Sequence, residues 1–306
     1  MPSSRRPLRR VLLVLLAVVV LADAAILLFP GERRWFRVYL ATPRNGCTPL
    51  AGLGAVRYTA RHRRLLAELR ATSRVLREMP DGTSLWHTRY GDYWAPTGDQ
   101  THLFVLAELE LEPYAAEGVH VAPGDVVLDC GAHVGLFARD ALRAGAGLVV
   151  AIDPGTAQVA CLERNFPAAI AAGRLRVYPK GVWHSAGELL FQDDGSATAS
   201  LAEAGARQAT VRVPVTTIDA LVDELGLSRV DFIKMDIEGA EQEALAGAAR
   251  TLARHRPKLA IAGYHKASDP REIPRVVRTA EARYRVTPGG CRLDLGEMRP
   301  LTLFLR

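Results

Sequence analysis

The sequence contains few cysteines and lacks several motifs that identify common nucleotide-binding proteins. Its four cysteines lie far apart and form no CxxC pair, which argues against a zinc site or a dithiol redox motif and fits a reducing compartment. No GxGxxG fingerprint or GxxxxGK[ST] loop is present, which argues against dinucleotide and nucleoside triphosphate sites. Apolar residues make up 49% of the 306 residues and charged residues 24%, which excludes a disordered or collagen-like chain.

The positive charge is concentrated at the start of the chain. Residues 1–78 contain fifteen arginines, no lysine and four acidic residues, a net charge of +11; the remaining residues carry −5, so the whole chain carries +6. Since the remainder is net acidic, we expect no nucleic-acid partner.

Residues 11–29 form an apolar run that is long enough to cross a bilayer. Eighteen of these nineteen residues are apolar, and as a helix they would extend roughly 28 Å. Flanking arginines, and the continuation of the run past Asp23, favour an uncleaved membrane anchor over a cleaved signal peptide. We expect an anchor at residues 1–30, a basic juxtamembrane segment at 31–82 and a folded domain at 83–306.

The basic segment contains an expected helix at residues 57–79, with leucines on one face and arginines on the other. Pro80 would end this helix. The pattern fits contact with anionic lipid headgroups, and it equally fits a surface helix that packs on the folded domain.

From residue 123 onward, short apolar runs alternate with helical patterns. The expected strands lie at residues 126–130, 148–153, 175–178, 230–236 and 258–264, with 301–305 as a closing edge strand. Weak alternation over residues 187–215 predicts an antiparallel excursion. Together these patterns predict an α/β fold, in which a doubly wound, mostly parallel sheet is covered by helices on both faces.

A glycine-containing turn follows the first expected strand. Asp129 ends the strand, and Gly131 and Gly135 allow a ligand to approach the N-terminus of the next helix. Asp153 ends the second strand, where a carboxylate can accept hydrogen bonds from both hydroxyls of a ribose. A GxxxG pair alone would be explained by helix–sheet packing, but its combination with these two acids predicts a nucleoside cofactor.

Charged residues also gather around the end of the expected strand at 230–236. Lys234 and Asp236 lie near its carboxyl end, where open parallel sheets bind ligands. Glu238 and Glu241 are expected in the first turn of the following helix, where acidic residues interact favourably with the helix dipole. Helix capping explains Glu241, but it does not explain Lys234 and Asp236.

These segments resemble the FkbM family of S-adenosylmethionine-dependent methyltransferases over residues 120–290. The resemblance rests on VLDCGAHVG, on the acid-Pro pair at 153–154, on TTID at 216–219, and above all on DFIKMDIEGAE at 231–241. His133 stands where the family often has Asn, and the stretch that ends in His265 replaces its more frequent acid-x-His ending.

The resemblance implies a class I, Rossmann-type methyltransferase domain that binds S-adenosyl-L-methionine. By the family pattern, the methionine part would lie at the turn after Asp129, the ribose at Asp153 and the adenine beside Gly181. The residues assigned in this way to the cofactor are Asp129, Gly131, Ala132, His133, Gly135, Asp153, Gly181 and Val182. The residues assigned to the methyl acceptor are Lys234 and Glu238.

Methyl transfer to a hydroxyl needs a base, since a neutral hydroxyl attacks a methyl group poorly. His265 is the favoured candidate, and Asp236 is the other, either as the base or as the group that orients the hydroxyl. Carboxylates such as Asp236, Glu238 and Glu241 suit magnesium, but their spacing does not demand an ion, and no metal is predicted.

We therefore expect a membrane-anchored, S-adenosylmethionine-dependent O-methyltransferase. Its domain would face the cytoplasm, where the cofactor is made, and its acceptor would be a sugar, glycolipid or secondary metabolite. The alternatives are a nicotinamide-dependent dehydrogenase and a non-catalytic, membrane-tethered scaffold with the same fold.

Overall fold

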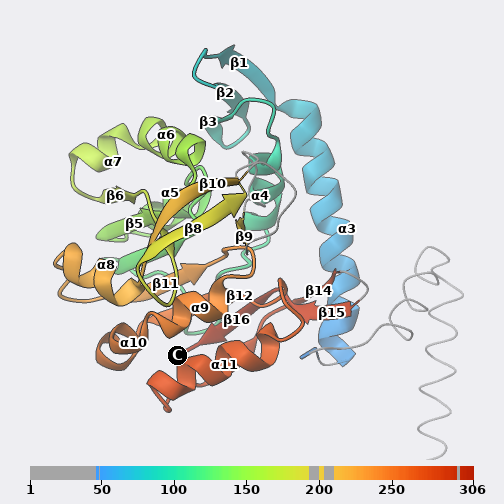
Figure 1. The fold of residues 1–306 in the computed structure, drawn as a ribbon. Coiled ribbons are helices and arrows are strands. Elements are labelled where there is room, and N and C mark those ends of the chain that lie inside the picture. The colour runs from blue at the N-terminus through green and yellow to red at the C-terminus, as the bar shows by residue number, and fades with distance from the viewer. Residues whose placement is uncertain (1–45, 48, 193–199, 203–209, 295–296) are drawn as a thin grey trace, which may run out of the picture. The chain divides into compact units, whose positions relative to one another are not determined.

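Aliphatic segments separated by glycine-containing turns form the central sheet of the protein (Figure 1). The computed structural model describes residues 46–47, 49–192, 200–202, 210–294 and 297–306. Within these ranges, seven strands lie side by side in the order β13, β16, β12, β11, β4, β5, β6. Their bounds are β4 Val126–Cys130, β5 Leu148–Ile152, β6 Leu175–Tyr178, β11 Phe232–Met235, β12 Lys258–Ala262, β13 Val286–Pro288 and β16 Thr302–Leu305.

Helices cover both faces of this sheet, and five of its strands are parallel. The helices that follow the strands are α5 Leu136–Arg143, α6 Thr156–Asn165, α7 Pro167–Ala171, α8 Ile218–Glu224, α9 Glu241–Ala246, α10 Ala249–His255 and α11 Asp269–Ala280. Alternate strand residues face opposite ways: Val127 packs with residues of α5, whereas Leu128 packs with residues of α8 to α11. The predicted α/β fold with a parallel-rich sheet is confirmed.

The order of the strands reverses between β4 and β11. β5 and β6 follow on one side of β4, whereas the chain continues with β11 and β12 on the other side. In open parallel sheets, ligands bind in the crevice outside the carboxyl ends of the strands at such a reversal. Gly131 and Asp236, which directly follow β4 and β11, lie at this point.

The prediction of an edge strand at residues 301–305 is wrong. β16 lies between β12 and β13 and is antiparallel to both. All four of its residues are buried, and Leu305 pairs with Leu259 on one side and Val286 on the other. Buried and exposed side chains do not alternate along β16, because strands flank it on both edges and packed residues cover both of its faces.

The prediction of one helix over residues 57–79 is only partly right. α3 (Pro49–Thr72) ends earlier, and β1 (Arg74–Glu78) then pairs with β2 (Thr83–Thr88), which pairs with β3 (Gly91–Pro96). The predicted boundary between residues 82 and 83 therefore falls inside a small antiparallel sheet.

α3 packs on the domain, as one of the two interpretations of its pattern predicted. The helix runs along one side of the domain, from the β1–β3 sheet to the hairpin of β14 (Cys291–Asp294) and β15 (Glu297–Pro300) (Figure 1). Leu65 and Leu69 are buried together with Trp86 and with residues of α4 (Thr101–Leu109).

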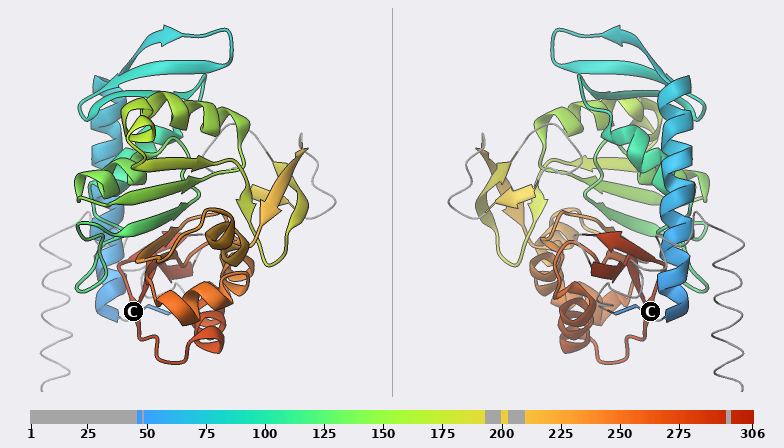
Figure 2. Two further views of the ribbon diagram at one scale, coloured as in Figure 1. Left: turned by 90° about the vertical axis from the view of Figure 1, so that its left-hand side faces the viewer. Right: turned by 90° about the vertical axis from the view of Figure 1, so that its right-hand side faces the viewer.

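The predicted antiparallel excursion is a four-stranded sheet that projects beside the main one (Figure 2). It contains β7 (Gly181–Val182), β8 (Gly187–Gln192), β9 (Ser200–Ala202) and β10 (Thr210–Thr216). β8 is antiparallel to both β9 and β10, whereas the short β7 runs parallel to β10.

Two of the four cysteines are joined, although their spacing gave no sign of it. Cys47 and Cys291 form a disulfide across a sequence separation of 244 residues, which brings the start of α3 to β14. Cys130 and Cys161 are free and buried. Since disulfides are rare in reducing compartments, this bond weakens the expectation of a reducing environment.

Within the ranges that the structure describes, no helix has the length and apolar character needed to cross a membrane. The predicted span at residues 11–29 lies outside these ranges.

Candidate functional site

Two cavities meet at the carboxyl ends of β4 and β11. The narrower cavity is lined by Asp153, Lys180, Gly181, Val182 and Phe191 among others. The wider one, of about 390 Å³, includes Phe104, Glu108, Tyr114, Tyr264, His265 and Arg292 in its lining. The residues that line both cavities are Gly131, His133, Asp236 and Glu238. This shared boundary is where a ligand in one cavity would meet a ligand in the other.

Two glycines shape the turn after β4. Gly131 has φ +77°, and a Cβ there would lie 2.0 Å from the backbone oxygen of Asp236, so only glycine lets the turn approach the end of β11. Gly135 has φ +89°, and a Cβ there would lie 2.2 Å from the ring of Phe166. Gly131 therefore borders the cavities, whereas Gly135 allows close packing of α5 against the end of α6.

Asp153 lies in the narrower cavity, where it was predicted to meet a ribose. Its Oδ2 accepts a hydrogen bond from the backbone N–H of His133 at 2.8 Å, and its Oδ1 accepts one from Gly155 at 2.9 Å. Burial raises the pKa of Asp153 to about 6. The two backbone donors fix the carboxylate, while the cavity lining gives it access to a ligand.

The other predicted cofactor residues fall into two groups. Gly181 and Val182 line the narrower cavity, and Ala132 lines the wider one. Asp129 is fully buried, and its Oδ1 lies 3.1 Å from Nζ of Lys234. Lys234 in turn donates a hydrogen bond of 2.8 Å to the backbone oxygen of Gly131. Asp129 and Lys234 thus form a buried ion pair that holds the glycine turn in place.

Asp236 is held by two tyrosines. The hydroxyl of Tyr114 donates to its Oδ2 at 2.5 Å, and the hydroxyl of Tyr264 lies 3.5 Å from its Oδ1. Burial acts to raise the pKa of Asp236, but the charges of His265 and Lys234 outweigh it and hold this pKa below its ordinary value. Asp236 is therefore an ionised hydrogen-bond acceptor at neutral pH.

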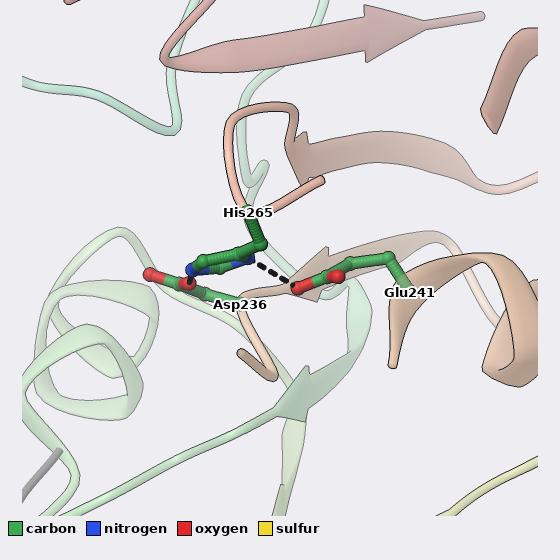
Figure 3. A group of neighbouring side chains, drawn as sticks. All are labelled: Asp236, Glu241 and His265. Carbon is green, nitrogen blue, oxygen red and sulfur yellow. Dashed lines mark hydrogen bonds and ion pairs between the residues drawn. The ribbon is translucent and has the colours of Figure 1, made fainter. Parts of the chain in front are cut away.

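The imidazole of His265 lies between acidic side chains (Figure 3). Its Nδ1 lies 2.9 Å from Oε1 of Glu241, whereas Nε2 lies 3.4 Å from Asp236 and 3.5 Å from Glu238. Burial acts to lower the pKa of His265, but the three carboxylates raise it to about 10. At neutral pH this ring is a cation whose Nδ1–H donates a hydrogen bond to Glu241.

The same three groups in Figure 3 raise the question of a metal ion, since ligand atoms of Asp236, Glu241 and His265 lie within 4.8 Å of one another. The ring nitrogens, however, face the two carboxylates in opposite directions. A metal ion needs lone pairs that converge on one point. The arrangement therefore suits a protonated imidazole between two acids better than an ion at these three residues.

Glu238 does not lie in the first turn of a helix, as its sequence position suggested. α9 begins at Glu241, whose Oε1 accepts a hydrogen bond from the backbone N–H of Ile237 in the turn before the helix. Glu238 precedes the helix in the left-handed region, with φ +54°. Its side chain is 26% exposed, and Glu238 lines both cavities.

The sequence interpretation missed the residues that form the far wall of the wider cavity. Glu108 is buried, and its Oε1 lies 3.6 Å from Nη1 of Arg292, whose guanidinium lies over the ring of Tyr264. A charged residue among the apolar side chains of α4 was a usable signal for Glu108. Tyr114 gave none, because it lies 122 residues from its partner Asp236.

Comparison with known proteins places this site within a recognised family. The family model described as "Methyltransferase FkbM domain" matches residues 129–286, just over half of the chain. The curated protein 31-O-demethyl-FK506 methyltransferase FkbM of Streptomyces tacrolimicus is 24% identical over 203 residues, which cover 55% of this chain and 74% of that protein.

Solved structures show more distant similarity. Methyltransferase FkbM from Methylobacillus flagellatus KT has a TM-score of 0.48 and 22% identity, and the match covers 67% of this chain and 53% of that chain. The present chain thus spans about half the length of that protein. A ribosomal protein L11 methylase from Lactobacillus delbrueckii subsp. bulgaricus has a TM-score of 0.38 and 14% identity, with 68% of this chain and 78% of that chain covered.

Proposed function

The chain belongs to the FkbM methyltransferase family, and we propose that it transfers a methyl group from S-adenosylmethionine to a hydroxyl of a sugar, glycolipid or secondary metabolite. The observation that carries this proposal is the boundary between the two cavities, where Asp236 and Glu238 line both. A methyl donor in one cavity and an acceptor in the other would meet at these acids. The name of the Streptomyces tacrolimicus relative gives a 31-O-demethyl compound as that protein's substrate, which supports an oxygen acceptor here.

The residues of the narrower cavity fit a nucleoside with a cationic sulfur. The Asp153 carboxylate, fixed by two backbone N–H groups, can accept hydrogen bonds from the two ribose hydroxyls. The close approach at Gly131 leaves backbone, rather than side chain, along the floor of the crevice. The carboxylates of Asp236 and Glu238 supply the negative charge that a sulfonium would meet. S-adenosylmethionine supplies an activated methyl group when it is bound.

The chain's own residues would bring the acceptor oxygen to the methyl group. Lys234 and Asp129 hold the turn at Gly131 in one geometry. Asp236, fixed by Tyr114, lies where the acceptor oxygen would be oriented for in-line attack. His265 keeps its ring in place through Glu241 and holds a positive charge beside Asp236. The aromatic lining of the wider cavity would exclude water.

Neither alternative function is favoured. Membership of a methyltransferase family argues against a nicotinamide-dependent dehydrogenase. A non-catalytic scaffold gives no reason for two acids, Asp236 and Glu238, to line both cavities.

Calorimetric titration of the full chain tests the cofactor proposal. We expect S-adenosylmethionine and S-adenosylhomocysteine both to bind, and Asp153→Ala to weaken both at least tenfold, because the ribose hydroxyls lose their acceptor. Asp223→Ala is the matched control, since Asp223 is an exposed acid of α8 that forms an ion pair with Arg250 of α10. Failure of both ligands to bind, or unchanged affinity in Asp153→Ala, contradicts the proposal.

Incubation with methyl-labelled cofactor then tests the acceptor class. Lipid, polysaccharide and small-molecule extracts should show label in one fraction, with the mass increase of a methyl ether. Label bound to nitrogen or carbon in the isolated product would contradict O-methylation.

A further inference from the structure

The geometry points to Glu238 as the residue that takes the proton from the acceptor hydroxyl during methyl transfer. This inference rests on the proposed function and names the base that the sequence left open between His265 and Asp236. The attacking oxygen must lie where the cavities meet, so the base must reach that boundary. His265 lines only the wider cavity, whereas Glu238 lines both.

Asp236 also reaches the boundary, but donors already surround its two oxygens. Oδ2 accepts the Tyr114 hydroxyl at 2.5 Å, and Oδ1 faces the Tyr264 hydroxyl and the His265 ring at 3.5 Å and 3.4 Å. These donors stabilise the ionised form and make it a weak proton acceptor. Asp236 is therefore poorly suited to deprotonate the hydroxyl.

Glu238 is placed differently. Its Oε2 lies 3.5 Å from Nε2 of His265, and a quarter of the side chain is open to solvent, which gives a proton a way out after each turnover. Burial, together with the charges of Asp236 and Glu241, outweighs the opposing charges of His265 and Arg292 and raises the pKa of Glu238 from 4.5 to about 7. A carboxyl group that titrates near the working pH is an effective general base.

The backbone supports a functional reason for this side chain. Glu238 adopts φ +54° directly before Gly239, which has φ +96°. A left-handed conformation costs a residue with a Cβ about 1 kcal/mol. Such strain at a cavity wall is typical of residues retained for their chemistry.

The step balances without another reactant. A bond forms between the acceptor oxygen and the methyl carbon, and the bond from that carbon to sulfur breaks with its electron pair staying on sulfur. The hydroxyl proton goes to the Glu238 carboxylate, which becomes a neutral acid. The positive charge of the sulfonium is thereby removed, and the departing thioether is neutral.

Proton linkage tests the inference without any acceptor. A sulfonium beside Glu238 favours its ionised form, whereas the neutral sulfur of S-adenosylhomocysteine does not. Calorimetry of the full chain at pH 7, in buffers with different ionisation enthalpies, should show that S-adenosylmethionine releases roughly half a proton more than S-adenosylhomocysteine. Glu238→Gln should bind both ligands and lose this difference. Glu243→Gln, which changes an exposed acid of α9, should keep the difference in proton release.

The outcomes separate the two proposals. If neither ligand binds, the proposed function fails; if both bind with equal proton release, or if Glu238→Gln keeps the difference, Glu238 is not the base. With the acceptor fraction, kcat/KM for S-adenosylmethionine should rise with pH to a plateau with a midpoint near pH 7, the pKa of Glu238 in the free protein. Glu238→Gln should lower kcat at least 100-fold while the KM for S-adenosylmethionine changes little. An unchanged kcat or pH profile overturns the inference.

Discussion

At Glu238, a strained backbone and a partly buried acid occur at one position. The φ of +54° and the raised pKa both work against the folded state. A glycine would adopt this conformation freely, and a glycine indeed follows at position 239. The position of the Glu238 carboxylate between the two cavities therefore lowers the free energy of unfolding of the protein.

The raised pKa of Glu238 predicts a specific pH dependence of stability. Between pH 4.5 and about 7, the folded carboxyl keeps a proton that the unfolded chain has lost. The folded state thus binds more protons, and its free energy of unfolding falls as the pH rises. Relative to wild type, Glu238→Gln should gain roughly 3 kcal/mol between pH 4.5 and pH 8.

Urea denaturation at several pH values measures this gain. Glu243→Gln serves as the control, since Glu243 is 43% exposed, and its stability relative to wild type should stay nearly constant. A Glu238→Gln curve parallel to wild type over the whole range would show that the native carboxyl titrates normally.

At the scale of elements, the turn after β4 and the end of β11 depend on each other. The turn at Gly131 lies so close to Asp236 that a single methyl group would collide with the backbone oxygen. Lys234, from β11, donates a hydrogen bond from Nζ to the backbone oxygen of Gly131 in the same turn. The two elements that border both cavities are therefore positioned as one unit.

This contact predicts a large effect for Gly131→Ala. The variant should lose about 3 kcal/mol of unfolding free energy or more, because positive φ and the collision add, and it should also lose S-adenosylmethionine binding. Gly173→Ala is the matched control, since Gly173 also has positive φ but has open space around it. It should lose only about 1 kcal/mol. Equal denaturation midpoints for the two variants would refute the close approach.

The sequence predicted the bounds of an element well where a local apolar run defines that element. The strands β4 to β6 lie where their apolar runs predicted them, because such runs are stable only when buried between helices. The helix predicted at 57–79 ended early because residues 74–78 pair with β2, and pairing with a distant segment leaves no local pattern.

At the scale of the whole molecule, one covalent bond joins the beginning and the end of the described chain. The Cys47–Cys291 disulfide encloses almost the entire domain. In the chain-entropy model, closing a loop of 244 residues stabilises the fold by about 5 kcal/mol. Reduction should therefore lower the Tm by about 10 °C. The melting of Cys47→Ser/Cys291→Ser should not respond to reductant, because Cys130 and Cys161 are free.

The same disulfide bears on which side of the membrane the folded domain lies. We propose that the protein is anchored through residues 11–29 with its domain at the cytoplasmic face, where S-adenosylmethionine is made. Alkylation of intact cells before lysis reports whether Cys47 and Cys291 are thiols. Free thiols support the cytoplasmic face, whereas a disulfide in cells places the domain in an oxidising compartment and overturns the proposal.

The sequence by itself determined the α/β fold, the position of the glycine turn and the acids at the strand ends, because these features follow from local periodicity and from the few residue types that such turns accept. Only the tertiary structure decided how the acids differ. It placed Tyr114 on Asp236, the His265 ring against Glu241, and Glu238 in a left-handed conformation between two cavities. The chemistry of a carboxylate depends on its burial and its neighbours, and those neighbours are 24 residues away for Glu241 and His265 and 122 residues away for Asp236 and Tyr114.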